Sequence, residues 1–169
     1  MWYVLQVRTG TEENIRAQCE KLLSESVLLD IFIPRYEEKR KVAGEWQTRT
    51  KILFPGYLFI DTDLPEELFL ELWRVNGFAR ILETGGEFVP LTEKERSFLL
   101  QLGGKEHMVE MSEGIIENSR LQITAGPLFG MEGIVRKVDR HKRKAWIEVE
   151  MFGRRQLLEI GLEIPVKTL

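Results

Sequence analysis

The chain has 169 residues, of which 43% are hydrophobic and 30% are charged, and its formal net charge is −3. This composition is typical of a globular protein with one or two domains, and no apolar run reaches the ~20 residues that a membrane span needs. The start of the chain lacks the charged lead of a signal peptide, and Cys19 is the only cysteine. We therefore expect a cytoplasmic protein without disulfides, in which Cys19 is a small buried residue.

The first part of the chain alternates predicted strands and helices. Strands are indicated by β-branched and aromatic runs, and helices by apolar residues at helical spacing. The predicted elements are a strand over 2–7, a helix from Glu12, a strand over 27–34, a hairpin with a loose tip over 36–51, a strand over 51–63 interrupted at Pro55-Gly56, a helix over 65–76, a strand over 79–82 and a capped helix over 92–102. This order predicts an α+β fold, an α/β sandwich with helices on a mostly antiparallel sheet, over residues 1–103.

The second part has a different pattern. Residues 104–119 contain Gly, Ser and mixed charges without periodicity, which predicts a linker. From residue 120 onward the sequence holds short runs split by Gly or charged turns. Residues 120–169 are therefore expected to form a small all-β barrel.

Positive charge is concentrated near the end of the chain. Residues 1–113 hold 14 Lys and Arg against 20 acids, whereas residues 114–169 hold 10 against 7. The basic residues of the second part cluster at two expected turns: Arg136, Lys137, Arg140, His141, Lys142, Arg143 and Lys144 at one, Arg154 and Arg155 at the next. Two basic edges on one small barrel suggest a phosphate-binding surface for RNA, although solvated turns are the alternative.

Two aromatic features permit two interpretations each. Trp146 is expected in the barrel core, with stacking on a base as the less favoured alternative. In the segment LFPGYLFI, residues 53–60, the aromatic side chains either fill the core or form an exposed docking patch. Strand alternation would place Tyr57 and Phe59 together on one face.

No pattern indicates catalysis. The two histidines, His107 and His141, lie in the expected linker and within a run of Lys and Arg, so no metal site is expected. Glycine-rich phosphate loops and a nucleophile with a neighbouring base are also missing from the sequence. We expect a binding protein, not an enzyme, without cofactor or metal.

Three segments in order, WYVLQVRTGTE, KILFPGYLFI and GPLFGMEGIVRKVDRHKRKAWIEVEMFGR, resemble the NusG family of transcription elongation factors. The resemblance implies an amino-terminal domain that binds the clamp helices of the largest subunit of bacterial RNA polymerase, and a five-stranded KOW barrel. By position, the polymerase-binding residues would be Phe54, Pro55, Gly56, Tyr57 and Phe59. Residues near the non-template DNA strand would be Arg8, Arg16 and Lys21.

Within the family, the segment VDRHKRKAW is similar to the LoaP group of specialised antitermination paralogs. That similarity implies recognition of a hairpin in the nascent leader RNA. We expect a monomeric protein without membrane contact. In general elongation factors of the family, the loop corresponding to Met151, Phe152 and Gly153 contacts the termination factor Rho or a ribosomal protein. This role, and that of a ribosome-associated KOW protein, are the alternatives.

Overall fold

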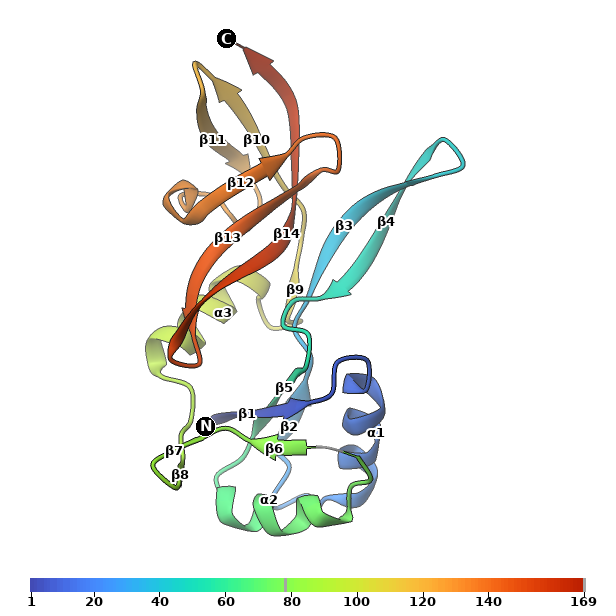
Figure 1. Ribbon diagram of the computed structural model, residues 1–169, viewed down its shortest axis with the longest axis vertical. Coiled ribbons are helices and arrows are strands. Elements are labelled where there is room, and N and C mark those ends of the chain that lie inside the picture. Colours follow the sequence, from blue (N-terminus) through green and yellow to red (C-terminus); the bar gives the residue numbers. More distant parts are fainter. Residues whose placement is uncertain (78, 169) are drawn as a thin grey trace. The chain divides into compact units, whose positions relative to one another are not determined.

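The computed structural model describes residues 1–77 and 79–168, and the chain divides into two compact units (Figure 1). Unit 1 comprises Met1–Ile33 and Phe54–Arg96, and unit 2 comprises Pro34–Leu53 and the chain from Ser97 onward. Leu169, the last residue of the expected barrel, lies outside the described residues. The segment 34–53 thus belongs to the same unit as the C-terminal strands, which the order of the sequence does not suggest.

Unit 1 contains a four-stranded antiparallel sheet in the order β2-β5-β1-β6. Its strands are β1 (Trp2–Val7), β2 (Asp30–Phe32), β5 (Tyr57–Asp61) and β6 (Ala79–Ile81). Both faces of the inner strand β5 are buried at Leu58, Phe59 and Ile60. The sheet confirms the α+β class, although the strand predicted over 27–34 is limited to β2.

The helices form where the apolar spacing predicts them. Unit 1 contains α1 (Glu12–Leu22) and α2 (Pro65–Glu71) with the 3-10 turn η1 (Leu72–Arg74), and α3 (Glu93–Gly103) begins in unit 1 and continues in unit 2 from Ser97. The short strands β7 (Glu83–Thr84) and β8 (Glu87–Phe88) lie between α2 and α3. The predicted capping box of α3 is present, because the Thr92 hydroxyl accepts the Glu95 N–H and the Glu95 carboxylate accepts the Thr92 N–H. Neither these helices nor the others in the described ranges are long and apolar enough to cross a membrane.

Unit 2 begins with the predicted hairpin. Strand β3 (Arg35–Val42) pairs with β4 (Glu45–Ile52) on one side and with β9 (Met108–Val109) on the other. The tip was expected to be loose, but it is a two-residue turn. Ala43 and Gly44 both have positive φ, 51° and 84°, which is the backbone of a turn that follows the twist of two paired strands.

The rest of unit 2 contains the end of α3 and the C-terminal barrel, a five-stranded sheet in the order β11-β10-β14-β13-β12. Its elements are β10 (Ser112–Glu117), β11 (Arg120–Ala125), η2 (Glu132–Ile134), β12 (Val135–Asp139), β13 (Lys144–Met151) and β14 (Arg154–Thr168). The long strand β14 pairs antiparallel with β13 through Gly161 and parallel with β10 from Leu162. One strand therefore joins the two parts of the curved sheet.

The prediction that residues 104–119 form a linker is wrong, because these residues contain β9 and β10. Gly114, one of the residues that suggested a linker, lies at a bulge where the pairing of β10 with β11 shifts register. A Cβ atom at this position would lie 2.8 Å from the Gln122 carbonyl oxygen. The glycine is required by the close approach of two strands, not by chain flexibility.

Strand β3 packs against β14 within unit 2 (Figure 1). The contact depends on Gly161, where a Cβ atom would collide with the Glu37 carbonyl oxygen and the Met111 side chain. Gly161 does not have a positive φ. Its role is therefore to leave space for the β3 backbone.

We predict that Gly161→Ala destabilises the protein by about 1–3 kcal/mol, because the added methyl group overpacks the β3–β14 contact. Gly133→Ala is the matched control, since a Cβ atom there meets nothing within 4 Å and the φ is not positive. Chemical denaturation of both variants measures the difference. Equal stability of Gly161→Ala and the wild type would contradict the tight contact.

Candidate functional site

The segment LFPGYLFI forms a turn that is fixed to the start of α1. The buried carboxylate of Glu12 accepts hydrogen bonds from the N–H groups of Gly10 at 2.6 Å and Gly56 at 2.8 Å. The Val7 N–H donates to the Gly56 carbonyl at 2.8 Å. Because both oxygens of Glu12 are used, the 53–57 turn and the β1–α1 loop are held together as one surface.

The aromatic side chains of this segment do not form one exposed patch. Phe59 has an exposed fraction of 0% and packs between the rings of Phe32 and Phe54, at centroid distances of 5.3 and 5.7 Å. The interpretation that Phe59 docks a partner is therefore wrong for this conformation, because both faces of β5 are covered, and Phe54, 1% exposed, is buried in the same core. Pro55 is exposed and Tyr57 half-buried, so these two remain at the surface.

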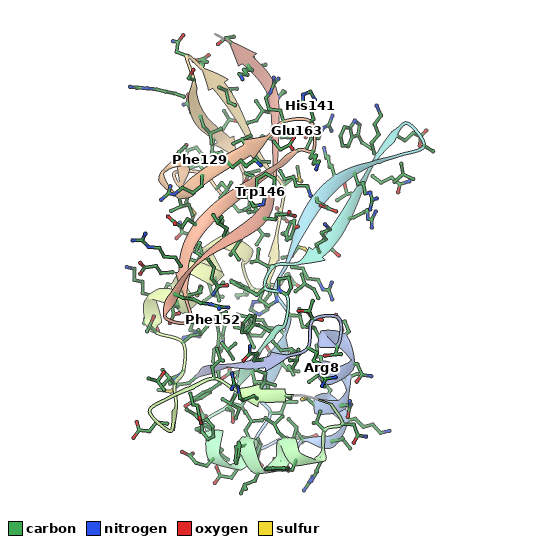
Figure 2. The ribbon with its side chains drawn as sticks, in the orientation of Figure 1. Arg8, Phe129, His141, Trp146, Phe152 and Glu163 are labelled. Carbon is green, nitrogen blue, oxygen red and sulfur yellow. The ribbon has the colours of Figure 1, made fainter. Side chains whose placement is uncertain are left out.

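The three cations expected near DNA lie around the same loop and helix. Arg8 is exposed in the β1–α1 loop (Figure 2). Arg16 pairs along α1 with Glu13 at 3.0 Å and with Glu20 at 3.8 Å. Lys21 is exposed in the last turn of α1. The charge of Arg16 is thus partly compensated by its own helix.

An exposed apolar cluster on α2, η1 and β8 was missed by the sequence analysis. The Phe69 ring lies 5.4 Å from the Phe88 ring and 6.3 Å from the Trp73 ring. Trp73 is 78% exposed. The signal was present in the sequence, because Phe69 and Trp73 repeat at the same four-residue spacing as the buried Leu68 and Leu72 but one position later, so they lie beside the buried side of this segment.

The basic turn between β12 and β13 presents exposed cations. Arg140, His141 and Lys142 are all exposed at its tip, and His141 marks this tip in Figure 2. The turn is closed by the carboxylate of Asp139, which accepts the Lys142 N–H at 3.0 Å. This hydrogen bond lowers the pKa of Asp139, because the Lys142 N–H stabilises the ionised carboxylate. The following residue, Arg143, has a φ of 55° and turns the chain into β13.

The strands beside this turn hold their cations differently. Arg136 pairs with Glu148 at 3.0 Å and donates to the Gly133 carbonyl at 2.6 Å. The Lys137 ammonium lies 4.8 Å from the centre of the Trp146 ring. Trp146 is half-buried on the outer face of β13, so its expected place in the barrel core is wrong. Alternate residues of β13 fill that core instead: Ala145, Ile147, Val149 and Met151.

The structure does not bring the two predicted basic edges together. Arg154 and Arg155 are exposed at the β13–β14 turn, and Arg155 lies 3.9 Å from Glu150. Phe152 is at this turn, at the opposite end of β13 from His141 (Figure 2). Eight residues of strand separate the turns, roughly 25 Å at the usual rise. The expected single footprint is thus two separate surfaces.

The basic turn is joined to the β3–β4 hairpin by polar contacts within unit 2. The Tyr36 hydroxyl donates to the Glu159 carboxylate at 2.7 Å. Lys144, with only 16% of its side chain exposed, lies 3.5 Å from Glu38 and 3.4 Å from Glu159. The pairing fixes the buried Glu38 carboxylate against a cation of the turn, which compensates the cost of its burial.

A second set of contacts lies one residue earlier in the turn. The Glu163 carboxylate forms ion pairs with the Arg143 guanidinium at 3.1 Å and with the Lys39 ammonium of β3 at 2.9 Å. The Arg143 guanidinium also lies 3.8 Å from the centre of the Trp46 ring on β4. Arg143 and Lys144 therefore hold the hairpin, while the tip residues before them face solvent.

The pKa of Glu159 reflects this arrangement. Burial of the carboxyl group would raise its pKa, but the Tyr36 hydroxyl and the Lys144 ammonium outweigh burial and lower it. Burial, together with the same contact, raises the pKa of Tyr36. Because the pKa of Glu159 is lowered on folding, its contribution to stability is present above the ordinary pKa of a glutamate and is lost as the pH falls through the folded value.

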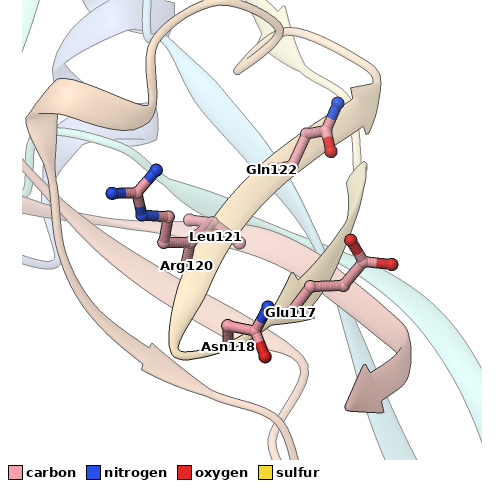
Figure 3. A pocket seen from close by; sticks show the side chains of 5 residues that line it. All are labelled: Glu117, Asn118, Arg120, Leu121 and Gln122. Carbon is pink, nitrogen blue, oxygen red and sulfur yellow. The ribbon is translucent and has the colours of Figure 1, made fainter. Parts of the chain in front are cut away.

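Other chemical features of the described residues do not form a reactive site. Cys19 is buried as expected, and burial raises the pKa of its thiol to about 12, so it is not a thiolate at neutral pH. No group of three or more metal-ligating side chains occurs in the described residues. A surface hollow of about 510 Å³ at the β10–β11 turn has a mixed lining (Figure 3), formed by Glu117, Asn118, Arg120, Leu121 and Gln122.

The fold and these surfaces define a binding protein that combines an α/β unit with a small basic β barrel. A family model described as "Transcription termination factor nusG" matches residues 1–100, and the chain belongs to the NusG family of transcription termination and antitermination factors. The resemblance stated from the sequence is thereby confirmed.

Individual relatives match over nearly the whole chain. The transcription termination/antitermination protein NusG of Borreliella burgdorferi is 27% identical over 177 residues, which cover 96% of this chain and 95% of that protein. The Thermus thermophilus protein of the same name is 29% identical over 179 residues, covering 98% and 97%. A solved structure of Thermotoga maritima NusG, described by its domain interaction, has a TM-score of 0.61 at 22% identity and covers 96% of this chain and 93% of that one.

We predict that Tyr36→Phe raises the pKa of Glu159, because the variant removes the hydroxyl that stabilises the carboxylate. During acid titration of the variant, the contact between the β3–β4 hairpin and the barrel should then be lost at a higher pH than in the wild type. The measurement is an NMR titration of the glutamate side-chain carboxyl carbons. Tyr57→Phe, which changes a tyrosine in unit 1, is the control. An unchanged Glu159 pKa in Tyr36→Phe would contradict the assigned cause.

Proposed function

We propose that this NusG-family protein is a processive antitermination and elongation factor that binds RNA polymerase and a structured leader RNA at the same time. The amino-terminal domain binds the clamp helices of the polymerase, and the basic turn of the barrel binds a hairpin of the nascent transcript. Tethering by two contacts raises the local concentration of the factor at one operon. Such a factor works in the cytoplasm, where the transcript emerges.

The observation that carries this proposal is that some cations of the basic turn anchor the turn and others are exposed to solvent. Arg143 and Lys144 are held by acids and by Trp46, whereas Arg140, His141 and Lys142 are exposed. An ordered turn with exposed cations contacts phosphates at a low entropic cost. Arg140 additionally has the planar guanidinium that recognises guanine edges or phosphates bidentately.

The polymerase contact is supported by the surface around the 53–57 turn. Exposed Pro55 and half-buried Tyr57 lie on a turn that Glu12 makes rigid. Arg8 belongs to the loop that the same carboxylate holds, since Gly10 is its other donor. A protein partner at Pro55 and Tyr57 and the non-template DNA strand at Arg8 would thus meet neighbouring parts of one surface.

A second candidate is a general elongation factor whose barrel contacts Rho or a ribosomal protein. The observation that favours it is Phe152, a half-buried aromatic residue with a φ of 56° in the β13–β14 turn. Bulky residues adopt this backbone region rarely, and such residues are concentrated at functional turns.

We predict that Arg140→Ala with Lys142→Ala weakens binding of the full chain to a leader stem–loop and lowers the salt slope of log K by about 2, because two phosphate contacts are lost. Arg143 is left intact, since its removal would also disturb Trp46 and Glu163. The probe is a stem–loop that the full chain selects from transcribed leaders of its own genome. Binding is measured by fluorescence anisotropy across a salt series, against scrambled RNA.

Phe152→Ala is the control for the second candidate and should leave the RNA affinity unchanged. An unchanged salt slope in the double variant would indicate that the basic turn is a solvated surface without RNA contacts. Loss of stem–loop preference in Phe152→Ala alone would instead favour the β13–β14 turn as the contact.

We predict that Tyr57→Ala weakens binding of the full chain to purified core RNA polymerase by roughly 2 kcal/mol, as expected for a central aromatic contact. Trp73→Ala removes a more exposed aromatic residue from the separate α2 cluster and should have little effect. Pull-down and titration measure binding, and circular dichroism checks folding. If affinity fell with Trp73→Ala and not with Tyr57→Ala, the docking surface would be the α2 cluster.

A further inference from the structure

The charge distribution changes when it is counted on the compact units. Unit 1 holds 7 Lys and Arg against 14 acids, and unit 2 holds 17 against 13. Much of the change comes from the segment 34–53, which carries six basic residues and three acids. The basic part of the protein is therefore larger than the turn at 139–144 and includes the β3–β4 hairpin.

The acids at the contact between hairpin and barrel are already compensated. Glu38 is paired by Lys144 and, more distantly, by Lys51 at 3.7 Å. Glu159 is contacted by Lys144 and the Tyr36 hydroxyl. Glu163 is shared by Arg143 and Lys39, as described above. These three carboxylates are thus neutralised locally, and they reduce the attraction of outer cations for a polyanion only weakly.

The hairpin presents exposed cations and polar groups on both of its faces. Arg40, Lys41 and Arg49 are exposed, and β4 is exposed from Glu45 to Thr50. In the β3–β4 register, Arg40 and Arg49 share one face with Gln47, and Lys41 shares the other face with Thr48 and Thr50. Cations beside hydroxyl and amide groups are the side chains that contact phosphate oxygens and ribose hydroxyls in RNA complexes.

The hairpin and the basic turn meet at one corner. Trp46, on the strand that leaves the hairpin tip, is 39% exposed and lies under the Arg143 guanidinium. Arg143 directly follows the exposed residues Arg140 to Lys142. The side chain that anchors the basic turn therefore also joins it to β4, and the two basic surfaces are contiguous.

We propose that the β3–β4 hairpin is a second wall of the RNA site, with Arg40, Lys41 and Arg49 contacting the backbone of the stem whose loop or end contacts Arg140, His141 and Lys142. This inference rests on the proposed RNA-binding function. An eight-residue strand extends roughly 26 Å, which is long enough to follow several phosphates of one RNA strand. The hairpin contributes affinity and prefers a duplex stem, while the turn contributes the contacts at the end of the stem.

The test compares two triple variants of the full chain. Arg40→Ala with Lys41→Ala and Arg49→Ala removes the hairpin cations, which do not take part in the pairs that hold the hairpin to the barrel. Lys94→Ala with Lys105→Ala and Arg120→Ala removes the same charge from exposed positions elsewhere. Matched unfolding temperatures of both variants and the wild type exclude a loss of folding.

The probes are the selected leader stem–loop, a single-stranded RNA of the same length and a DNA duplex of the stem sequence. We expect the hairpin variant to bind the stem–loop at least tenfold more weakly, with a salt slope lower by about 2 to 3. The control variant should keep the slope of the wild type. The loss should be smaller for single-stranded RNA, because the hairpin follows the duplex stem.

Different failures are distinguishable. If the hairpin variant keeps the wild-type slope while Arg140→Ala with Lys142→Ala lowers it, the inference is overturned and the proposed function stands. A loss for the DNA duplex without a loss for the stem–loop also overturns the inference, in favour of DNA. If the wild type does not prefer the stem–loop to scrambled RNA, both the inference and the proposed function fail.

Discussion

The packing of β3 on β14 determines what unit 2 presents to a partner. Gly161 leaves room for the β3 backbone, and the bond from the Tyr36 hydroxyl to Glu159 fixes it there. Around this contact, Lys144 and Arg143 reach from the barrel to the hairpin. Since a buried acid without its cation is costly, the network favours one register of hairpin on barrel. The exposed cations of both elements are consequently held by an ordered scaffold.

The same arrangement explains the charge concentration in an acidic chain. Acids of the barrel and hairpin, such as Glu38 and Glu163, are oriented toward internal cations. Arg140 and Lys142 at the turn, and Arg40, Lys41 and Arg49 along the hairpin, face solvent. Unit 1, with its excess of acids, instead presents a rigid turn and apolar side chains. The two units thus differ in the kind of partner that they suit, a polyanion and a protein surface.

Much of this fold was predictable from local patterns, because strands β1 and β5, helix α1 and the capping box at Thr92 obey short-range rules. Features set by distant neighbours were not. Gly114 suggested a linker, although close strand packing requires it. Strand alternation correctly indicates which neighbours share a face with Phe59 and with Trp146. It does not indicate which face of each strand is covered by the rest of the protein. The bond between Tyr36 and Glu159 joins positions 123 residues apart, so no local pattern predicts the hairpin as part of the basic surface.

The central claim is that an RNA stem–loop contacts the basic turn together with the hairpin of unit 2. Ultraviolet cross-linking of the full chain to the selected leader stem–loop, followed by mass spectrometry of the cross-linked peptides, tests it most directly. The account predicts cross-links in peptides that contain residues 40–49 and 139–144. Cross-links restricted to the β13–β14 turn around Phe152, or to unit 1, would contradict it.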